Sequence, residues 1–329
     1  MDAVSLLEKL VNIESPSGRE EEIASFLSSY LKKLGLRVKD DYNVVANPEV
    51  DFWIVTHMDT VAPKAKFKFD GKYAYGTGVC DAKGSIAAIL LALEKLKKPK
   101  FGVAFLRDEE ETGMGSELFA REFSGKAIVM EPTSLKIAIE NYGVLEIDVK
   151  VKGKQTHGAT PESGENAIKK AIEMIERLGT LHNFTILKMK GGSDEYVIPD
   201  SCELRLDFLL KPEENVLELK KKVLDLTSMY GNVEVLEESE GFISDGEAKF
   251  MLEAAMKAAG LRVDYTVMPS WTDAINLRNA GWDVVVWGPG ELVYCHTPLE
   301  RIAIEEIEEA GKVIVALNEV LKGWKQNKV

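Results

Sequence analysis

The sequence has few cysteines and no long apolar run. Cys80, Cys202 and Cys295 are an odd number in a chain of 329 residues, so a framework of disulfides is not expected and a reducing compartment suits them. The longest apolar run, Ile86 to Leu93, is too short to cross a bilayer, and the acidic N-terminal segment lacks the positive charge of a signal peptide. We therefore expect a cytoplasmic protein without a membrane segment.

Positive charge is also in deficit. The 41 Lys and Arg residues stand against 54 Asp and Glu residues, which gives a formal net charge of -13. Proteins that bind nucleic acid or anionic membranes need a basic face, so neither partner is expected. The 45% of hydrophobic residues is typical of a globular protein with a sizeable core, and the length allows two domains. Scarce glutamine beside abundant Lys and Glu favours a source in a hot environment.

Apolar segments and helical patterns alternate along the first part of the chain. Phe52 to Val55 and Phe101 to Leu106 are typical of buried strands, and Ser85 to Leu96 contains helix formers without a breaker. Alternating strands and helices predict an α/β fold with a mostly parallel sheet and helices on both of its faces.

The pattern changes near Tyr142. From there the sequence predicts strands at 144–151, 184–189, 202–210 and 233–236, and helices at 166–178 and 214–229. This order, βαββαβ, is that of a ferredoxin-like unit. Because the alternation of helix and strand resumes after Gly241, we predict an inserted domain of residues 142–237 within a first domain of residues 1–141 and 238–329.

Several imidazole and carboxylate groups follow apolar, strand-like runs. Ligands of α/β proteins bind outside the carboxyl ends of the strands, so this placement predicts one convergent site. Imidazole and carboxylate together suit zinc, manganese or cobalt. If Asp81 bridges two ions, each ion keeps one histidine and one glutamate. The predicted ligands are His57, Asp81, Glu111, Glu131 and His296.

Two neighbouring positions would support such a site. Asp59 lies two residues after His57, on the same side of an extended segment, where it can accept the second imidazole N–H. The consecutive glutamates 109–111 offer one ligand and one general base. Taken alone, a His-x-Asp pair is usually structural and a run of glutamates usually forms a solvated helix face. The metal site is favoured by their joint occurrence after apolar runs.

Five motifs carry a family resemblance. They are Thr-His57-Met-Asp59-Thr-Val, Gly-Thr-Gly-Val-Cys-Asp81-Ala-Lys-Gly, Asp-Glu-Glu-Glu-Thr-Gly-Met-Gly-Ser, Glu131-Pro-Thr and Cys-His296-Thr-Pro. Together they resemble the co-catalytic zinc aminoacylases, which include acetylornithine deacetylase, succinyl-diaminopimelate desuccinylase, carboxypeptidase G and tripeptidase T. The resemblance implies two Zn²⁺ ions, with Co²⁺ or Mn²⁺ as substitutes. One ion would be held by His57, Asp81 and Glu131, and the other by Asp81, Glu111 and His296. A cis peptide at Asp81-Ala82 is also implied.

The three consecutive glutamates allow two registers of the family pattern. If the two glycines that follow are matched, Glu110 is the general base and Glu111 is the ligand. If Asp108 is matched, Glu109 is the base and Glu110 is the ligand. We prefer the glycine register as the prediction.

In this family the inserted unit is a lid and the dimerisation domain, which implies a homodimer. The segment around His157 resembles one whose histidine enters the partner's active site and stabilises the oxyanion, although an exposed turn residue is the alternative. Many relatives have a carboxylate-binding arginine where Leu209 stands, and Arg205 has the same strand parity. Further substrate-binding candidates are Asn166, Ser270, Thr272 and Asp273.

Two of the cysteines, Cys80 and Cys295, adjoin predicted ligands. Neighbours in an extended segment point to opposite faces, so we expect these cysteines to lie behind the ligands as small apolar packing. The alternatives are zinc ligation and a redox role.

The resemblance implies hydrolysis of an amide on the amino group of an amino acid. The length, the composition and the segment Gly-Pro-Gly-Glu-Leu-Val-Tyr-Cys-His-Thr-Pro look most like enzymes that release lysine or ornithine from the amino-group carrier protein LysW. The net negative charge of the chain argues against binding to LysW, because that carrier is itself acidic. A deacetylase of acetyl-lysine or acetylornithine is the close alternative, followed by a desuccinylase or a dipeptidase. A non-catalytic binding module is the alternative of another class, and it would be expected to lack the base or a ligand.

Overall fold

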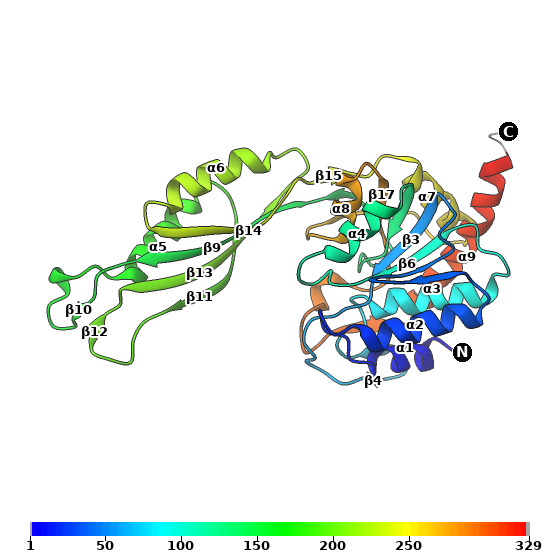
Figure 1. The fold of residues 1–329 in the computed structure, drawn as a ribbon, viewed down its shortest axis with the longest axis horizontal. Coiled ribbons are helices and arrows are strands. Elements are labelled where there is room, and N and C mark those ends of the chain that lie inside the picture. Colours follow the sequence, from blue (N-terminus) through cyan, green and yellow to red (C-terminus); the bar gives the residue numbers. More distant parts are fainter. Residues whose placement is uncertain (1, 327–329) are drawn as a thin grey trace. The chain divides into compact units, whose positions relative to one another are not determined.

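A computed structural model describes residues 2–326, which fall into two units (Figure 1). Unit 1 contains the described residues up to Ile139, then Ser244–Met268 and the residues from Thr272 onward. Unit 2 contains Glu140–Ile243 and Pro269–Trp271. The observed boundaries differ slightly from the predicted ones, because a strand predicted to end at residue 236 continues to Ser239 and a short strand follows it at Phe242–Ile243.

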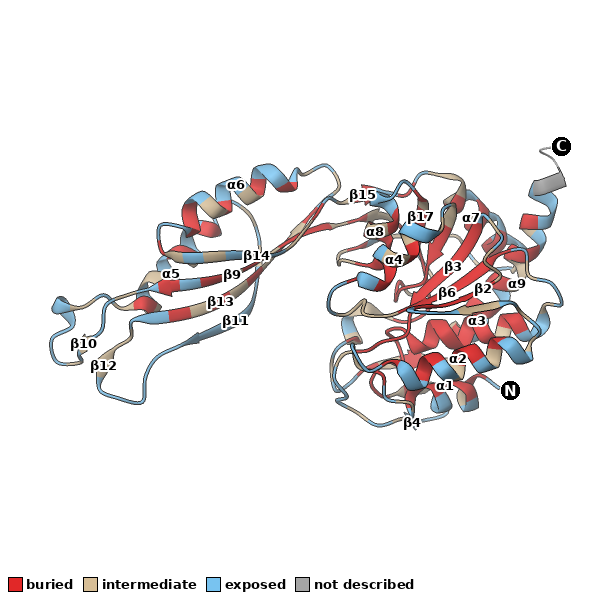
Figure 2. Ribbon diagram, viewed as in Figure 1, coloured by how far each residue is buried: buried red, intermediate tan, exposed pale blue. Residues whose placement is uncertain are grey.

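Unit 1 is built on a mixed sheet whose four middle strands are parallel. These are β6 (Gly102–Leu106), β3 (Phe52–His57), β7 (Lys126–Val129) and β17 (Asp283–Val286). Every residue of β3 and β6 is buried, as expected for parallel strands that are covered on both faces (Figure 2). The strand order is β1-β2-β6-β3-β7-β17-β8, with β16 also on β8, and β15 pairs with the last two residues of β8 within unit 2. The outer strands are β1 (Val38–Asp40), β2 (Val44–Ala46), β8 (Ile137–Asn141), β15 (Phe242–Ile243) and β16 (Tyr265–Met268).

Helices cover both faces of this sheet, as the sequence predicts. Alternate residues of β3 point to opposite faces: Ile54 joins the main apolar core, whereas Trp53 packs edge-on against Phe119, with ring centroids 5.1 Å apart. The core side is formed by α1 (Ala3–Val11), α2 (Glu21–Lys33), α3 (Lys83–Lys95), α7 (Glu247–Ala258) and α9 (Ile304–Gln326). The side of Trp53 is formed by α4 (Met114–Glu122) and α8 (Asp273–Asn279).

Unit 1 also contains a small second sheet that the sequence patterns do not predict. Its order is β18-β5-β4, with β4 at Lys68–Phe69, β5 at Tyr73–Tyr75 and β18 at Arg301–Ala303. Two- and three-residue strands are too short to produce a detectable alternation of apolar residues. This sheet places the segment after His296 next to the segment before Asp81.

Unit 2 has the predicted βαββαβ order. Its antiparallel sheet runs β11-β13-β9-β14, and its helices α5 and α6 share one apolar core with the sheet. The strands are β9 (Gly143–Lys152), β11 (Thr185–Gly191), β13 (Ser201–Leu210) and β14 (Gly231–Ser239), and the helices are α5 (Ala167–Leu178) and α6 (Val216–Thr227). A separate pair is formed by β10 (Thr156–His157) and β12 (Val197–Ile198). The order of elements is therefore confirmed.

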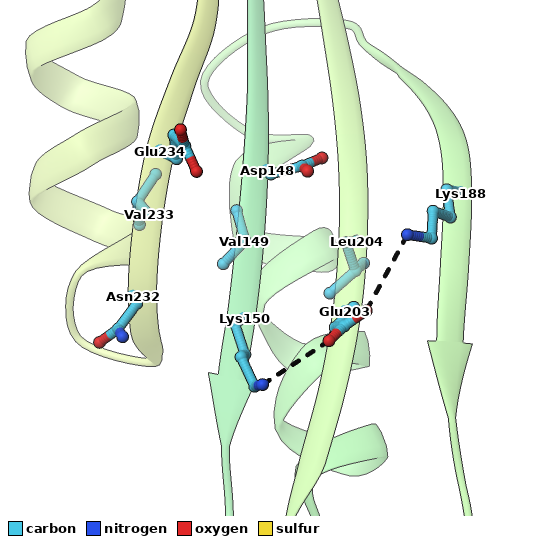
Figure 3. Close-up of a pocket in the computed structure, with 9 residues that line it drawn as sticks. All are labelled: Asp148, Val149, Lys150, Lys188, Glu203, Leu204, Asn232, Val233 and Glu234. Carbon is cyan, nitrogen blue, oxygen red and sulfur yellow. Dashed lines mark ion pairs between the residues drawn. The ribbon is translucent and has the colours of Figure 1, made fainter.

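The other face of this four-stranded sheet is polar and carries a groove of about 390 Å³ (Figure 3). The Glu203 carboxylate on β13 pairs with Lys150 at 3.7 Å and with Lys188 at 3.9 Å (Figure 3). All residues that line the groove belong to unit 2, and none is a predicted metal ligand. Among residues 2–326, no helix combines the length and the apolar character needed to span a membrane.

Candidate metal centre

Strand β3 ends at His57, whose imidazole is completely buried. Its Nδ1 lies 3.0 Å from the carbonyl oxygen of Asp59, and its Nε2 lies 2.9 Å from Asp81 Oδ1. A carbonyl oxygen can only accept, so Nδ1 carries the proton and Nε2 is left free to bind a cation. The predicted control of the tautomer is therefore exerted chiefly by the backbone of Asp59, while its carboxylate Oδ1 lies 3.4 Å from Nδ1.

The Asp59 carboxylate links the end of β3 to the acidic loop that follows β6. It accepts hydrogen bonds from the backbone N–H groups of Glu109 at 3.2 Å and Glu110 at 3.1 Å, and from the Ser17 hydroxyl at 2.8 Å. Burial alone would raise the pKa of Asp59, but His57 and these donors hold it below its ordinary value. Asp59 is thus a charged anchor for the loop.

The change Asp59→Asn is expected to weaken metal binding by roughly 10- to 100-fold, the scale seen when groups behind metal ligands are altered. The amide keeps the size of the side chain, but its NH2 group replaces one acceptor oxygen, so a donor then faces a backbone N–H donor. A competition assay with a chromophoric chelator measures this affinity. Ser17→Ala is the matched control, since it removes one donor to the same carboxylate and leaves the loop anchored. Equal affinities for Asp59→Asn and the wild type would contradict this role.

A buried glutamate that the sequence analysis missed positions Asp81. The Glu300 carboxylate accepts backbone N–H groups from Gly78 at 3.0 Å, Cys80 at 3.0 Å and Asp81 at 3.2 Å. Burial raises the pKa of Glu300 to about 7, although these donors oppose the shift. Glu300 lies four residues after the predicted ligand His296, and this proximity is the sequence feature that could have drawn attention to it. The Asp81-Ala82 peptide is cis, as the family resemblance implies.

The first ligand cluster contains His57, Asp81 and Glu131, whose ligand atoms all lie within 4.8 Å of one another. Glu131 follows β7 and is buried, and its Oε1 has no hydrogen-bond partner among the described residues. Burial raises the pKa of Glu131 well above its ordinary value. A buried carboxylate oxygen without a partner is costly unless a cation compensates it, so this cluster fits a metal ion.

The second cluster contains Asp81, Glu110 and His296. His296 Nε2 lies 2.9 Å from Glu110 Oε2 and 3.3 Å from Asp81 Oδ2, and these carboxylates raise the pKa of His296 to about 10. Asp81 belongs to both clusters, with Oδ1 toward His57 and Oδ2 toward His296. This is the arrangement that a carboxylate bridging two ions requires.

The acidic loop brings Glu110, rather than Glu111, into the second cluster. Glu110 belongs to the second cluster, whereas Glu111 is exposed and lies outside both clusters. Asp108 has a left-handed backbone, with φ of 62°, which turns the chain so that the amides of Glu109 and Glu110 face Asp59. Glu109 is half-buried, and burial raises its pKa well above the ordinary value. The register matched on Asp108 therefore fits the structure better.

The loop before α8 adds a buried acid near the clusters. Asp273, the first residue of α8, is fully buried near the Ser116 hydroxyl, and among the described residues neither carboxylate oxygen makes a hydrogen bond of good geometry. Burial raises its pKa to about 7, and its charge in turn raises the pKa of Glu109 and Glu131. Thr272 is buried beside it, and its hydroxyl has no hydrogen-bond partner within residues 2–326. Ser270, the third candidate of this loop, belongs to unit 2.

The other candidates lie in unit 2. His157 is exposed, its Nδ1 accepts the Ala159 N–H at 3.2 Å, and its ring packs edge-on against Tyr196. Asn166 caps α5 by accepting backbone N–H groups, which gives it a structural role. Arg205 Nε donates to Asp148 at 3.1 Å, so its guanidinium already has an acidic partner.

The α/β sheet, with its carboxylate and imidazole ligands gathered around the ends of parallel strands, defines a metal-binding enzyme fold. The chain belongs to peptidase family M20/M25/M40, whose sequence profile matches residues 53–319, and it is therefore a hydrolase of that family. Enzymes of this family generally depend on two metal ions, and the two clusters that share Asp81 fit that requirement.

The chain resembles two hydrolases in sequence and one solved structure in fold. A LysW-lysine/LysW-ornithine hydrolase from Sulfurisphaera tokodaii is 28% identical over 325 residues, which cover 92% of this chain and 90% of that protein. Carboxypeptidase G2 from Pseudomonas sp. is 34% identical over 245 residues, which cover 62% of this chain and 59% of that protein. The crystal structure of a tripeptidase from Staphylococcus aureus shares the fold, with a TM-score of 0.84 at 23% identity, covering 97% of this chain and 98% of that chain.

Proposed function

We propose that this protein is a metal-dependent amidohydrolase that releases free lysine or ornithine from an N-acylated precursor. The observation that carries the activity is the bridging position of Asp81 between two ligand clusters, with Glu109 in the same loop as the ligand Glu110. The proposed precursor is the γ-glutamyl amide on the carrier protein LysW. Its support is the similarity to the Sulfurisphaera tokodaii hydrolase over nearly the full length of both chains.

Two divalent ions would be held by the side chains of the two clusters, with Zn²⁺ as the proposed metal and Co²⁺ or Mn²⁺ as substitutes. His57 and Glu131 would complete one site, and Glu110 and His296 the other, with Asp81 shared between them. When bound, the ions would supply Lewis acidity that polarises the amide carbonyl and acidifies water. The Glu131 oxygen that lacks a partner among the described residues supports the proposal that a cation binds there.

Glu109 is the proposed general base. Its carboxylate accepts a proton from the attacking water and returns that proton to the nitrogen of the leaving amine. Burial makes Glu109 a stronger base than a free glutamate, because its pKa is raised. The Asp59 carboxylate holds the backbone of Glu109 and so orients this base. Glu110, the base in the preferred sequence register, is proposed as a ligand instead.

His157 is proposed to act from a second copy of the chain. The Ala159 N–H donates to Nδ1, so in the neutral imidazole the proton resides on Nε2. His157 therefore presents an N–H donor that can stabilise a developing oxyanion.

A homodimer through unit 2 is proposed on the basis of strand β11. Every residue of β11 is exposed, and within the described residues this strand pairs only with β13. Its exposed apolar side chains include Ile186, Leu187 and Met189. An open apolar edge of this kind is suited to pairing with another chain.

A hydrolysis panel tests the substrate. The compounds are γ-glutamyl, acetyl and succinyl conjugates of lysine and ornithine, succinyl-diaminopimelate and a dipeptide, each assayed with added Zn²⁺ or Co²⁺ at elevated temperature. We expect kcat/KM for the γ-glutamyl conjugates to exceed that for the acetyl conjugates by about 10-fold or more, since a polar site discriminates strongly among acyl groups. Equal or better cleavage of the acetyl compounds would replace this proposal with a small-molecule deacetylase.

A further inference from the structure

Cys80 and Cys295 lie against each other, although 215 positions separate them in the sequence. Their sulfur atoms are 3.2 Å apart, and both residues are buried. Each cysteine directly precedes a proposed metal ligand, Asp81 in one case and His296 in the other. The sequence pattern predicts apolar packing at each position and gives no sign of this contact.

The surrounding contacts hold the two thiols face to face. Both sulfur atoms lie 3.7 Å from the same acceptor, the carbonyl oxygen of Glu291. The backbone N–H of Cys80 donates to the buried Glu300 carboxylate at 3.0 Å. A Cβ atom at Gly290 would come within 2.4 Å of the Cys80 sulfur, so this loop packs closely on the thiol. The pair is therefore built into a restrained environment.

We propose that Cys80 and Cys295 form a reversible disulfide that fastens the loop of His296 to the loop of Asp81. Two thiols become one disulfide, with loss of two protons and two electrons to an oxidant such as a hydroperoxide. Cys295 is 8% exposed and Cys80 is 0% exposed, so the oxidant meets Cys295 first.

The reaction with a hydroperoxide has two balanced steps. The Cys295 sulfur attacks the peroxide O–O bond and becomes a sulfenic acid, while the other oxygen leaves as water or an alcohol. The Cys80 sulfur then attacks the Cys295 sulfur, which forms the S–S bond and releases water. Because both thiols are buried and an oxidant seldom reaches them, we expect the reaction to take hours rather than seconds.

The disulfide would restrict the motion of His296, which is the most exposed side chain of the second cluster. The side chain of His296 is 49% exposed, whereas those of the other two members of its cluster, Asp81 and Glu110, are 10% and 5% exposed. A covalent link at the preceding residue would limit the excursions of His296 from its cluster. The sequence bias toward hot environments agrees with this inference, since intracellular proteins from such sources often contain disulfides.

Mass spectrometry of the intact chain tests the disulfide directly. The reduced wild-type protein is incubated with hydrogen peroxide, and in parallel with oxidised glutathione. We expect a loss of about 2 Da, the two hydrogens removed when a disulfide forms. A non-reducing digest should then yield one linked peptide pair that contains Cys80 and Cys295. Failure of the mass loss, or a link to Cys202 instead, would overturn the proposal.

Single substitutions provide the controls. Cys295→Ser and Cys80→Ser should each abolish the mass loss. Cys202→Ala should retain it, because Cys202 is buried in the core of unit 2 and is a matched third thiol. Persistence of the loss in Cys295→Ser would overturn the assignment. These readouts do not depend on turnover, so their failure is distinct from failure of the proposed function.

The fastening role is tested by metal release, and only this measurement rests on the proposed metal site. Oxidised and reduced wild-type protein are loaded with Zn²⁺, and the rate of transfer to a chelator is followed. We expect release from the oxidised form to be slower by roughly tenfold or more, the scale of groups that orient metal ligands. Cys80→Ser should release metal at one rate whatever the oxidant. Equal rates for both wild-type forms would overturn the fastening role.

Discussion

Glutamine in place of Glu109 is expected to lower kcat by about 10²- to 10⁴-fold, the range for loss of a general base, while both metal ions remain bound. The amide has the size of the carboxylate but cannot accept the proton of the attacking water. Steady-state kinetics on the preferred substrate measures the loss of kcat, and mass spectrometry of the metal content shows whether both ions remain bound. Unchanged kcat in Glu109→Gln would remove Glu109 from the mechanism.

The two neighbouring glutamates are matched controls for this experiment. Glu110→Gln should lose metal at the second cluster, because Glu110 lies 2.9 Å from His296 there. Glu111→Gln should resemble the wild type, because Glu111 is exposed. Loss of metal in Glu111→Gln instead would restore the glycine register. A wild-type chain that binds two ions but cleaves nothing in the panel would favour the binding-module alternative.

Removal of the metal ions is expected to lower Tm, and the decrease should be larger at pH 8 than at pH 5. Burial raises the pKa of Asp273 from 3.8 to about 7 and that of Glu300 from 4.5 to about 7, so the folded metal-free chain binds more protons than the unfolded chain. The stability of the metal-free protein should therefore fall as pH rises from about 4 to about 7. Bound cations replace protons in balancing these charges.

The raised pKa of His296 also makes the metal-free chain less stable as pH rises, whereas the lowered pKa of Asp59 makes it more stable as pH rises. The pKa of His296 is raised from 6.5 to about 10, so its contribution is complete below pH 6.5 and is lost as pH rises toward 10. The pKa of Asp59 is lowered from 3.8, so its contribution is present above that value and is lost in stronger acid. The metal-free chain should thus be most stable under mildly acidic conditions.

Thermal unfolding of the metal-free and metal-loaded chains at pH 5, 6, 7 and 8 tests this expectation. Asp273→Asn is the matched variant, since it removes a buried charge without changing the size of the side chain. At pH 8, the difference in Tm between the metal-loaded and metal-free chains should be smaller for Asp273→Asn than for the wild type. A difference in Tm that is constant with pH, or greatest at pH 5, would contradict the electrostatic account.

The sequence predicts the parts of the fold that have a clear local pattern. The fully buried strands β3 and β6 appear as continuous apolar runs, and α3 appears as a segment of helix formers without a breaker. The six elements of unit 2 follow from alternating or amphipathic patterns of adequate length. His57, Asp81, Glu131 and His296 could be singled out because each follows such a segment or belongs to a motif, and the structure brings all four together.

The remaining features depend on backbone geometry and long-range contacts that no local pattern encodes. The placement of Glu110 rather than Glu111 in the second cluster depends on the left-handed turn at Asp108 and on two amide hydrogen bonds to Asp59. Burial of Glu300 depends on three backbone donors more than 200 positions away. The contact between Cys80 and Cys295 has the same origin, because it requires the segments before Asp81 and His296 to meet.

The most direct test of the metal centre is anomalous diffraction at the zinc edge from crystals of the Zn²⁺-loaded protein. Two peaks are expected, both in contact with Asp81. One should be ligated by His57 and Glu131, and the other by Glu110 and His296. A single peak, no peak between these side chains, or a peak ligated by Glu111 in place of Glu110 would contradict the account.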